Sequence, residues 1–219
     1  MSSFINLLAK ELENKLPGKK AQDKMSPDIR KRLNHAPDNK TKNSCVLIAI
    51  YSQNNEYFTI LFKRPDYDGI HAGQVCFPGG KVESGDTSFE DTALREAAEE
   101  IGLNKKIVKI IGKLTPLYIP VSNYIVQPFI AYIESIPILV PDSKEVDRIL
   151  IAPLKSLLNP ENVMSKKINF RGSKMVIPYF FINSMEIWGA TAMILSEFLT
   201  ILKRPSFQHT DLYSADNVL

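Results

Sequence analysis

Residues 95–103 have the sequence Arg95-Glu96-Ala97-Ala98-Glu99-Glu100-Ile101-Gly102-Leu103 and end a segment with a strong helical pattern. In that segment apolar or small residues recur at every fourth position: Phe89, Ala93, Ala97 and Ile101. Thr87 and Glu90 have the spacing of a capping box, and Gly102 is a typical helix stop. The periodicity therefore predicts a helix from about residue 88 to residue 100.

Three carboxylates share one face of this predicted helix. At about 100° per residue, Glu96, Glu99 and Glu100 fall within an arc of roughly 100°. Such carboxylates repel one another unless cations neutralise them, and hard Mg²⁺ or Mn²⁺ ions suit oxygen ligands. A solvated acidic helix face is the alternative for a Glu-Glu pair alone. Gly79 and Gly80, just upstream, favour a substrate site because a glycine backbone allows close approach of an extended anion.

The segment from Gly80 to Leu103 resembles the Nudix box, in which a glycine and a spacer precede Arg-Glu-apolar-x-Glu-Glu-x-Gly-apolar. Gly80 to Arg95 spans sixteen positions, one more than in the general box, and Asp86 stands about where a spacer glutamate is expected. One extra spacer residue resembles the coenzyme A pyrophosphatase branch of the Nudix hydrolases.

Residues upstream of the box resemble a second signature of that branch: Ile60-Leu61-Phe62-Lys63-Arg64, Gly73 and Phe77-Pro78-Gly79-Gly80. The fit is partial, since Phe62 replaces an expected threonine, Pro65 a small serine or alanine, and Gly69 an expected arginine. Residues 187–192, Ile-Trp-Gly-Ala-Thr-Ala, are similar to a segment near the end of this branch. The resemblance covers the chain from about Cys45 to Leu202.

The resemblance implies an enzyme that uses Mg²⁺ or Mn²⁺ to hydrolyse a pyrophosphate bond, with coenzyme A split into 4'-phosphopantetheine and 3',5'-ADP. It makes Glu96 and Glu100 metal ligands and Arg95 the residue that orients Glu96. Glu99 is then a further ligand or the group that activates water. Some family members take the general base from a distant loop, where Glu145 is the candidate.

Substrate binding is expected at Arg64, Gly79 and Gly80. Lys63 and Arg64 end a predicted strand before the substrate-side loop, where a cation would meet phosphates, although a solvated surface is an equal alternative. With Gly69 in place of the expected arginine, recognition of the 3'-phosphate falls to Arg64 or to residues 166–174, which include Lys166, Lys167, Arg171 and Lys174. These basic residues surround a short strand pattern, for which a solvated hairpin is the favoured alternative.

Other conspicuous residues have ordinary structural explanations. His71 lies between glycines in a loop, where a lone histidine is more often a bystander than a catalyst. Trp188 suits stacking on a base, but its place at the start of an apolar helix favours core packing. Cys45 and Cys76 lie in apolar strand-like runs without metal-ligand spacing, which argues against a disulfide framework or a zinc site.

The order of elements predicts an α/β (α+β) fold, a Nudix-type α/β/α sandwich around a mixed sheet. A hairpin is expected from two β-branched or aromatic runs, 45–51 and 57–62, and a second long helix at about 187–202. Further strands are expected at 107–111, 124–133, 149–151 and 175–182. The predicted division is an N-terminal helical and basic appendage over 1–43, a hydrolase domain over 44–203 and a mobile tail over 204–219.

Composition narrows the partners. The chain has 219 residues, 44% of them hydrophobic, and a net charge of only +3, which argues against a strongly basic nucleic-acid binder. Apolar residues in the first helix are interrupted by Glu11 and Glu13, unlike a signal peptide, and no run is long enough to span a bilayer. We expect a cytoplasmic protein that binds a small molecule; whether it forms a homodimer is open.

Three other functions compete with coenzyme A hydrolysis. The predicted helix with the three glutamates would equally serve hydrolysis of another nucleoside diphosphate derivative, such as a dinucleotide or ADP-ribose. A nucleotide-sensing protein on the same fold would be marked by loss of the carboxylates, all of which are present here. An RNA-processing pyrophosphatase is suggested only by the basic residues between Lys19 and Arg32, and the low net charge weighs against it.

Overall fold

The first two long strands form the hairpin that the sequence predicts. Strand β1 (Lys42–Gln53) pairs antiparallel with β2 (Glu56–Lys63). The turn residues Asn54 and Asn55 have φ values of 52° and 60°. Asparagine tolerates this left-handed conformation, whose twist matches that of the flanking strands. The computed structural model describes residues 2–28, 36–66, 71–170, 173–208 and 212.

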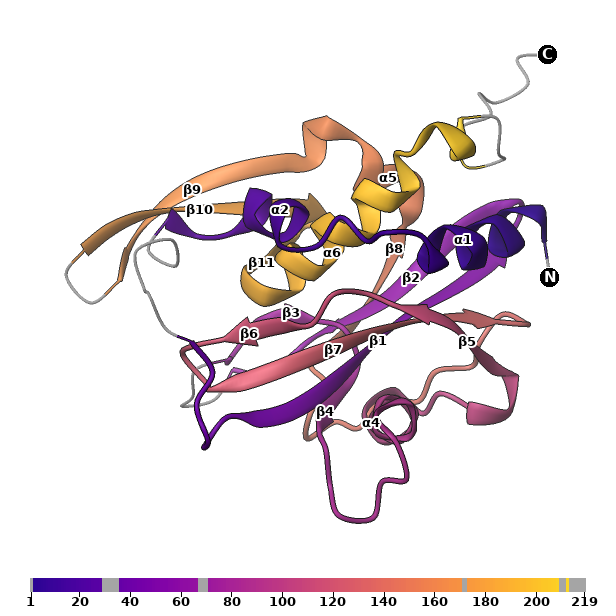
Figure 1. The fold of residues 1–219 in the computed structure, drawn as a ribbon, viewed down its shortest axis with the longest axis horizontal. Coiled ribbons are helices and arrows are strands. Elements are labelled where there is room, and N and C mark those ends of the chain that lie inside the picture. The colour runs from indigo at the N-terminus through magenta and orange to yellow at the C-terminus, as the bar shows by residue number, and fades with distance from the viewer. Residues whose placement is uncertain (1, 29–35, 67–70, 171–172, 209–211, 213–219) are drawn as a thin grey trace.

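A mixed sheet of eight strands forms the middle layer (Figure 1). Its main order is β3-β2-β1-β7-β5, with β4 paired to β1, β6 to β7 and β8 to β2. The β1–β7 pair is parallel and the others are antiparallel. The remaining strands of the sheet are β3 (Val75–Cys76), β4 (Gly79–Lys81), β5 (Val108–Lys113), β6 (Leu117–Ile119), β7 (Tyr124–Ile133) and β8 (Arg148–Pro153).

Helices cover both faces of this sheet, as predicted for a three-layer sandwich (Figure 1). Helix α4 (Phe89–Ile101) packs Ala93, Ala97 and Ile101 against one face. Helices α1 (Ser3–Glu13) and α6 (Gly189–Leu202) pack against the other. Alternate side chains of β1 enter the two cores, because successive residues of a strand point to opposite faces.

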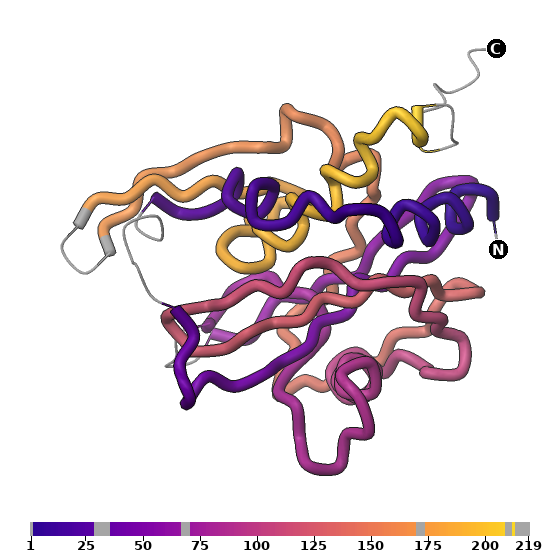
Figure 2. The backbone as a smooth tube through the Cα atoms, in the orientation of Figure 1, coloured from indigo at the N-terminus to yellow at the C-terminus, as the bar shows by residue number. Residues whose placement is uncertain are grey.

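A second sheet of three strands, β9 (Val163–Phe170), β10 (Ser173–Ile182) and β11 (Met185–Trp188), joins β8 to α6. Figure 2 shows β9 and β10 as a long hairpin that extends beyond the main sheet. The sequence predicted part of β10 and a hairpin around residues 166–174, but it did not predict β11. The missed turn lies at Asn183 and Ser184, which both have positive φ values.

The N-terminal segment differs from the expected appendage because it belongs to the main core. Phe4, Ile5 and Leu8 are fully buried in the cluster that includes α6. The short helices α2 (Lys19–Gln22) and η1 (Asp23–Met25) pack against α6, with Ala21 and Met25 buried. The basic residues Arg30, Lys31 and Arg32 lie outside the described part of the chain.

The C-terminal segment also packs further than expected. Phe207, in the short helix η4 (Pro205–Phe207), is fully buried, and Leu212 is 3% exposed. The expected mobile tail otherwise falls at 209–211 and 213–219, outside the described residues. Short helices complete the fold: η2 (Lys105–Ile107), α5 (Leu154–Leu158) and η3 (Pro160–Asn162). In the described part of the chain, no helix is long and apolar enough to cross a membrane.

Candidate active site

The two ends of helix α4 are explained by the local contacts and conformations of Ser88 and Gly102. The Ser88 hydroxyl oxygen accepts a hydrogen bond from the Asp91 amide at 3.1 Å, one residue after the predicted Thr87 cap. Gly102 adopts φ 67° and ends the helix, and an added Cβ there would lie 2.8 Å from the Val140 carbonyl oxygen. The predicted helix is confirmed to within one residue at each end, so its carboxylates share the expected face.

Glu100 is the most deeply buried carboxylate of this face. Its side chain is 2% exposed, and Oε2 accepts a hydrogen bond from the Gly79 amide at 2.8 Å. Arg64 Nη2 approaches Oε1 at 3.4 Å. The pKa of Glu100 is raised to about 8, mainly by burial and also by the charges of Glu96 and Glu145, while the hydrogen bond from Gly79 and the charge of Arg64 oppose the rise. The site thus holds an acidic group whose negative charge is only partly compensated.

The glycine turn leaves room for the Glu96 carboxylate. An added Cβ on Gly80 would overlap that carboxylate, so a residue with a side chain would displace it. At Gly79, which has φ 151°, an added Cβ would lie 2.6 Å from the Val46 Cα. Burial raises the pKa of Glu96, although its partner Arg95 opposes the shift. Gly80 is therefore needed for Glu96 to lie beside the backbone of β4, and Gly79 for the close approach of β4 to β1.

Arg95 holds the acidic residues of the box in place. Its guanidinium donates two hydrogen bonds to Asp86, from Nε at 2.8 Å and from Nη2 at 3.0 Å. Its Nη1 donates to Glu96 at 3.0 Å and to Glu99 at 2.9 Å. These bonds hold the pKa of Asp86 well below its usual range and raise that of Arg95. Asp86, noted in the sequence only for its position in the spacer, fixes the arginine that orients Glu96.

A family model described as NUDIX domain matches residues 41–170 of this chain, a range that includes the carboxylate helix and the glycine turn. This chain is a member of the Nudix family. It is 34% identical over 177 residues to "Nudix hydrolase 15, mitochondrial" of Arabidopsis thaliana, covering 74% of this chain and 60% of that protein. It is 30% identical over 182 residues to "Nudix hydrolase 3" of Caenorhabditis elegans, covering 75% of each.

The chain spans about 60% of the length of the Arabidopsis relative. Among solved structures, a MutT/nudix family protein from Enterococcus faecalis aligns with a TM-score of 0.48 and 13% identity, covering 95% of this chain and 79% of that one. The family match includes all of helix α4 and the glycine turn. The segment from Gly80 to Leu103 is accordingly the Nudix box of this chain.

The box residues fit a divalent cation, although they do not form a finished ligand set. Among the described residues, no three His, Cys, Asp or Glu side chains already form a cluster that could hold a metal ion. Arg95 draws Glu96 and Glu99 to itself, and Arg64 approaches Glu100. The site offers carboxylate oxygens beside a glycine turn, and burial raises the pKa of two of these carboxyl groups. Mg²⁺ and Mn²⁺ prefer such oxygen ligands.

The two candidate bases reach the carboxylate face from different elements, Glu99 from α4 and Glu145 from the loop before β8. Glu99 is 59% exposed and pairs with Arg95. Glu145 is exposed in the loop before β8, close enough for its charge to raise the pKa of both Glu96 and Glu100. The Asp142 amide donates to the Glu100 carbonyl at 2.9 Å, which brings this loop to the end of α4. Both candidates therefore border the carboxylate face, which leaves the choice of base to experiment.

Arg64 and Lys63 have different surroundings. Arg64 lies over the Phe62 ring, with its guanidinium carbon 5.4 Å from the ring centroid, and it faces Glu100. Lys63 is instead paired with Asp147 at 3.2 Å, on the other side of β2. Phe62, which stands where the family signature has threonine, is fully buried, so its ring is a fixed surface on which the Arg64 guanidinium packs. Of the two cations, the structure brings only Arg64 to the box.

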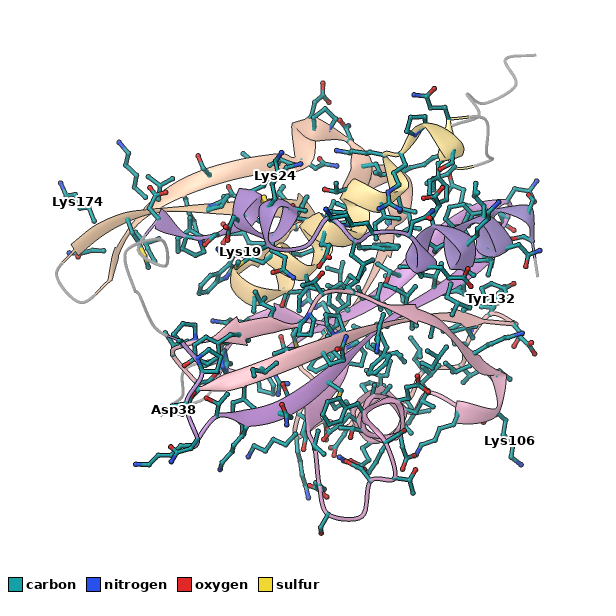
Figure 3. The ribbon with its side chains drawn as sticks, in the orientation of Figure 1. Lys19, Lys24, Asp38, Lys106, Tyr132 and Lys174 are labelled. Atoms are coloured by element: carbon teal, nitrogen blue, oxygen red, sulfur yellow. The ribbon has the colours of Figure 1, made fainter. Side chains whose placement is uncertain are left out.

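The remaining sequence candidates lie away from the box or have structural roles. His71 Nδ1 is 3.1 Å from the Gln74 Oε1. Lys166 pairs with Glu186, and Lys174 projects from the far end of the β9–β10 hairpin (Figure 3). Cys45 and Cys76 are free thiols, and burial raises the pKa of each to about 12. Two predicted positions, Gly69 and Arg171, lie outside the described residues.

Proposed function

We propose that this chain hydrolyses the pyrophosphate bond of a nucleoside diphosphate derivative with Mg²⁺ or Mn²⁺, and that coenzyme A or a close derivative is its substrate. The observation that carries the proposal is the environment of Glu100. It is a buried carboxylate that receives one backbone hydrogen bond and faces two further acidic residues, Glu96 and Glu145. A divalent cation would supply the missing positive charge.

Each residue of the box then has a role. Glu96 and Glu100 hold the cation, with Glu99 as a third ligand if it leaves Arg95. When bound, Mg²⁺ or Mn²⁺ supplies positive charge to the phosphoryl oxygens and eases the deprotonation of water. Arg95, fixed by Asp86, keeps the Glu96 carboxylate turned toward Gly80.

The reaction needs a proton acceptor. Water attacks phosphorus, the bond from that phosphorus to the bridging oxygen breaks, and the departing phosphate keeps the bond's electron pair. Glu99 or Glu145 accepts the proton that the water loses. A pH–rate profile of the Glu99→Gln and Glu145→Gln variants separates them, because only loss of the true base removes the acidic limb of the profile.

Arg64, Gly79 and Gly80 supply the substrate contacts in this proposal. The Arg64 guanidinium has a planar set of donors that suits a phosphate, and the Phe62 ring restricts its motion. Its 3.4 Å contact with Glu100 is long for a charged hydrogen bond. We therefore expect the Arg64 guanidinium to leave Glu100 and to bind a substrate phosphate when a cation neutralises the charge of Glu100.

Coenzyme A is favoured over other substrates by sequence resemblance. The extended spacer, the Phe77-Pro78-Gly79-Gly80 segment and the Trp188-Gly189 segment resemble one branch of the family together. Dinucleotides and ADP-ribose share the same pyrophosphate chemistry and are the second candidates. A non-catalytic nucleotide sensor is disfavoured because all three glutamates of the box are present.

The test is a hydrolysis screen of the full chain with Mg²⁺ or Mn²⁺. Coenzyme A, its acylated and oxidised forms, dephospho-coenzyme A, ADP-ribose, dinucleotides and nucleoside triphosphates are compared, with products identified by mass. We expect 4'-phosphopantetheine and 3',5'-ADP from coenzyme A. Glu100→Gln, purified in the same way, is the matched control for a contaminating hydrolase.

Two outcomes would count against the proposal at different levels. A kcat/KM for dephospho-coenzyme A or ADP-ribose more than about tenfold above that for coenzyme A, about 1.4 kcal/mol in transition-state binding, removes the coenzyme A assignment. The pyrophosphatase assignment survives that result. Absence of metal-dependent hydrolysis across the whole panel removes both.

A further inference from the structure

A cavity of about 180 Å³ lies between the main sheet and strand β11. Lys63, Gly73 and Val75 form one wall, and Met185 and Trp188 of β11 belong to the other. Strand β11 packs beside β3, as Figure 1 shows. None of these five residues belongs to the carboxylate face of α4, so the cavity is a second feature of the molecule.

The cavity is nonetheless next to the Nudix box, because two strands contribute to both. On β2, Lys63 lines the cavity while the following residue, Arg64, contacts Glu100. On β3, Val75 lines the cavity while Cys76 packs with the α4 face. Successive residues of a strand point to opposite faces. The cavity and the carboxylate face therefore lie on opposite faces of the sheet, and a molecule that occupies both must pass the end of β2, where Lys63 and Arg64 are consecutive residues.

Trp188 is placed as a wall of the cavity instead of a core residue. Its neighbour Ile187 is fully buried and makes the core contact that the sequence suggested for both. Trp188 is only half-buried. Gly189, with φ 66°, starts α6 directly after it, so the indole stands at the end of a strand. Trp188 therefore combines partial exposure with a place in the cavity wall, as a ring that contacts a ligand requires.

The charges around the cavity are already balanced. Lys63 pairs with Asp147 at 3.2 Å, and Glu186, which also lines the cavity, pairs with Lys166. Neither offers a net charge to a phosphate. What remains is an indole, a thioether, a valine side chain and the Ser184 hydroxyl. This lining suits a flat, uncharged ring with polar atoms at its edge more than it suits an anion or a flexible chain.

We propose that this cavity binds the purine ring of the substrate's nucleoside, stacked on Trp188 and in contact with Met185. The identity of the ring as part of a substrate rests on the proposed function, since the pyrophosphate must lie at Glu100 at the same time. Trp188 and Met185 are then specificity-determining residues that act on binding of the nucleoside. Stacking of a base on an aromatic side chain contributes substantially to nucleotide affinity.

The first experiment uses the single tryptophan of the chain as its own probe. The full-length, metal-free protein is titrated with adenosine, which has the ring but no phosphate, and Trp188 fluorescence is recorded. We expect a saturable decrease with adenosine and none with ribose or pantetheine. No saturable change with adenosine, or an equal change with pantetheine, overturns the proposal.

The second experiment measures kinetics with the substrate that the hydrolysis screen identifies. Trp188→Leu and Met185→Ala should raise KM, for Trp188→Leu by at least about fivefold, with a smaller change in kcat. Trp188→Phe, which keeps a ring, should recover most of the loss. Phe181→Leu is the matched control, because Phe181 is 43% exposed on the adjoining strand β10 and does not line the cavity.

A KM for Trp188→Leu within about twofold of the Phe181→Leu value, with circular dichroism showing both folded, overturns the purine assignment. The two proposals fail separately. If the wild-type chain hydrolyses nothing, the proposed function is lost, and adenosine quenching of Trp188 still decides the cavity. If hydrolysis proceeds without adenosine quenching, the cavity proposal is lost and the function stands.

Discussion

Among the residues that the structure describes, two glutamates are buried, and their surroundings differ sharply. Glu197 of α6 is 0% exposed, and four donors point to its carboxylate: the Gly18 amide, the Gln22 amide group, and the backbone and hydroxyl of Thr115. Glu100 of α4 is 2% exposed and has one close donor, Gly79, with two acidic neighbours. Equal burial thus accompanies very unequal compensation.

The difference separates a structural carboxylate from one prepared for a ligand. The donors to Glu197 come from two parts of the chain distant from α6, so this residue links the N-terminal segment and the β5–β6 connection to α6. A buried carboxylate satisfied by hydrogen bonds needs no further partner. Glu100 has oxygen atoms whose charge remains to be met, which is costly unless a cation binds.

The largest expected effect is on catalysis. Glu100→Gln or Glu96→Gln should lower kcat/KM at least about a hundredfold, about 2.7 kcal/mol, because each variant loses a negatively charged oxygen for the cation. Steady-state kinetics at saturating metal measures it. The matched control is Glu197→Gln, which should stay within about threefold of wild type when assayed folded. Near-normal turnover in Glu100→Gln, with its structure verified by circular dichroism, excludes that residue as a ligand.

The second effect is on stability, where a change at Glu197 should matter more than a change at Glu100. Glu197→Ala should lower the free energy of unfolding by about 3 kcal/mol, because it leaves several buried donors without an acceptor. Urea denaturation measures the change. Glu100→Gln should cost far less, since it removes a poorly compensated charge. Equal destabilisation by the two changes would show that the two carboxylates do not differ as their contacts indicate.

The third effect is the pH dependence of stability without metal. The pKa of Glu100 is raised from 4.5 to about 8 by burial, so the folded state binds a proton that the unfolded state has released. The stabilisation is full below about pH 4.5 and is lost as the pH rises through about 8. Relative to wild type, metal-free Glu100→Gln should gain about 4 kcal/mol of unfolding free energy between pH 5 and pH 9, about 1.4 kcal/mol for each pH unit below the pKa of about 8.

Parallel stability curves for wild type and Glu100→Gln over that pH range would contradict this assignment. Addition of Mg²⁺ or Mn²⁺ at high pH should stabilise wild type and leave Glu100→Gln nearly unchanged, because ligand binding to the folded state adds to its stability. Thermal unfolding at fixed metal concentration gives this comparison directly.

The smallest of these effects concerns Arg64. Arg64→Lys should raise KM about fivefold, about 1 kcal/mol, because lysine keeps the charge but loses the planar donors and the stacking on Phe62. Lys155→Arg is the matched control, since Lys155 pairs with Glu56 near the opposite end of β2 and does not line the cavity. An equal rise in KM for both changes would indicate a general effect of exchanging lysine and arginine instead of a contact from Arg64.

Local features of the sequence predicted much of the site. Helix α4 follows from the four-residue repeat of small and apolar residues and from Gly102, and the glycine turn follows from Gly79 and Gly80. Three contacts of the site are therefore local: Arg95 with Glu96, which the sequence predicted, and Arg95 with Glu99 and Gly80 with Glu96, which it did not. Each joins residues that a single helix or its preceding turn brings together.

Contacts between distant segments of the chain could not be predicted in the same way. The apolar residues Phe4, Ile5 and Leu8 have helical spacing, but the sequence does not say that they pack into the same core as α6. The anchor is Glu197, which lies 175 or more residues from Gln22 and Gly18 along the chain. A polar segment with few apolar residues resembles an appendage until its hydrogen-bonding partner is known.

The sequence by itself determined the family, the helix that carries Glu96, Glu99 and Glu100, and the turn that faces it, because these depend on spacing within about twenty-five residues. Only the tertiary structure decided that Glu100 is buried, that Glu145 lies near it, that Arg64 faces the box while Lys63 does not, and that Trp188 borders a cavity. Burial and the approach of distant charges are set by how layers pack, and no local pattern of residues encodes them.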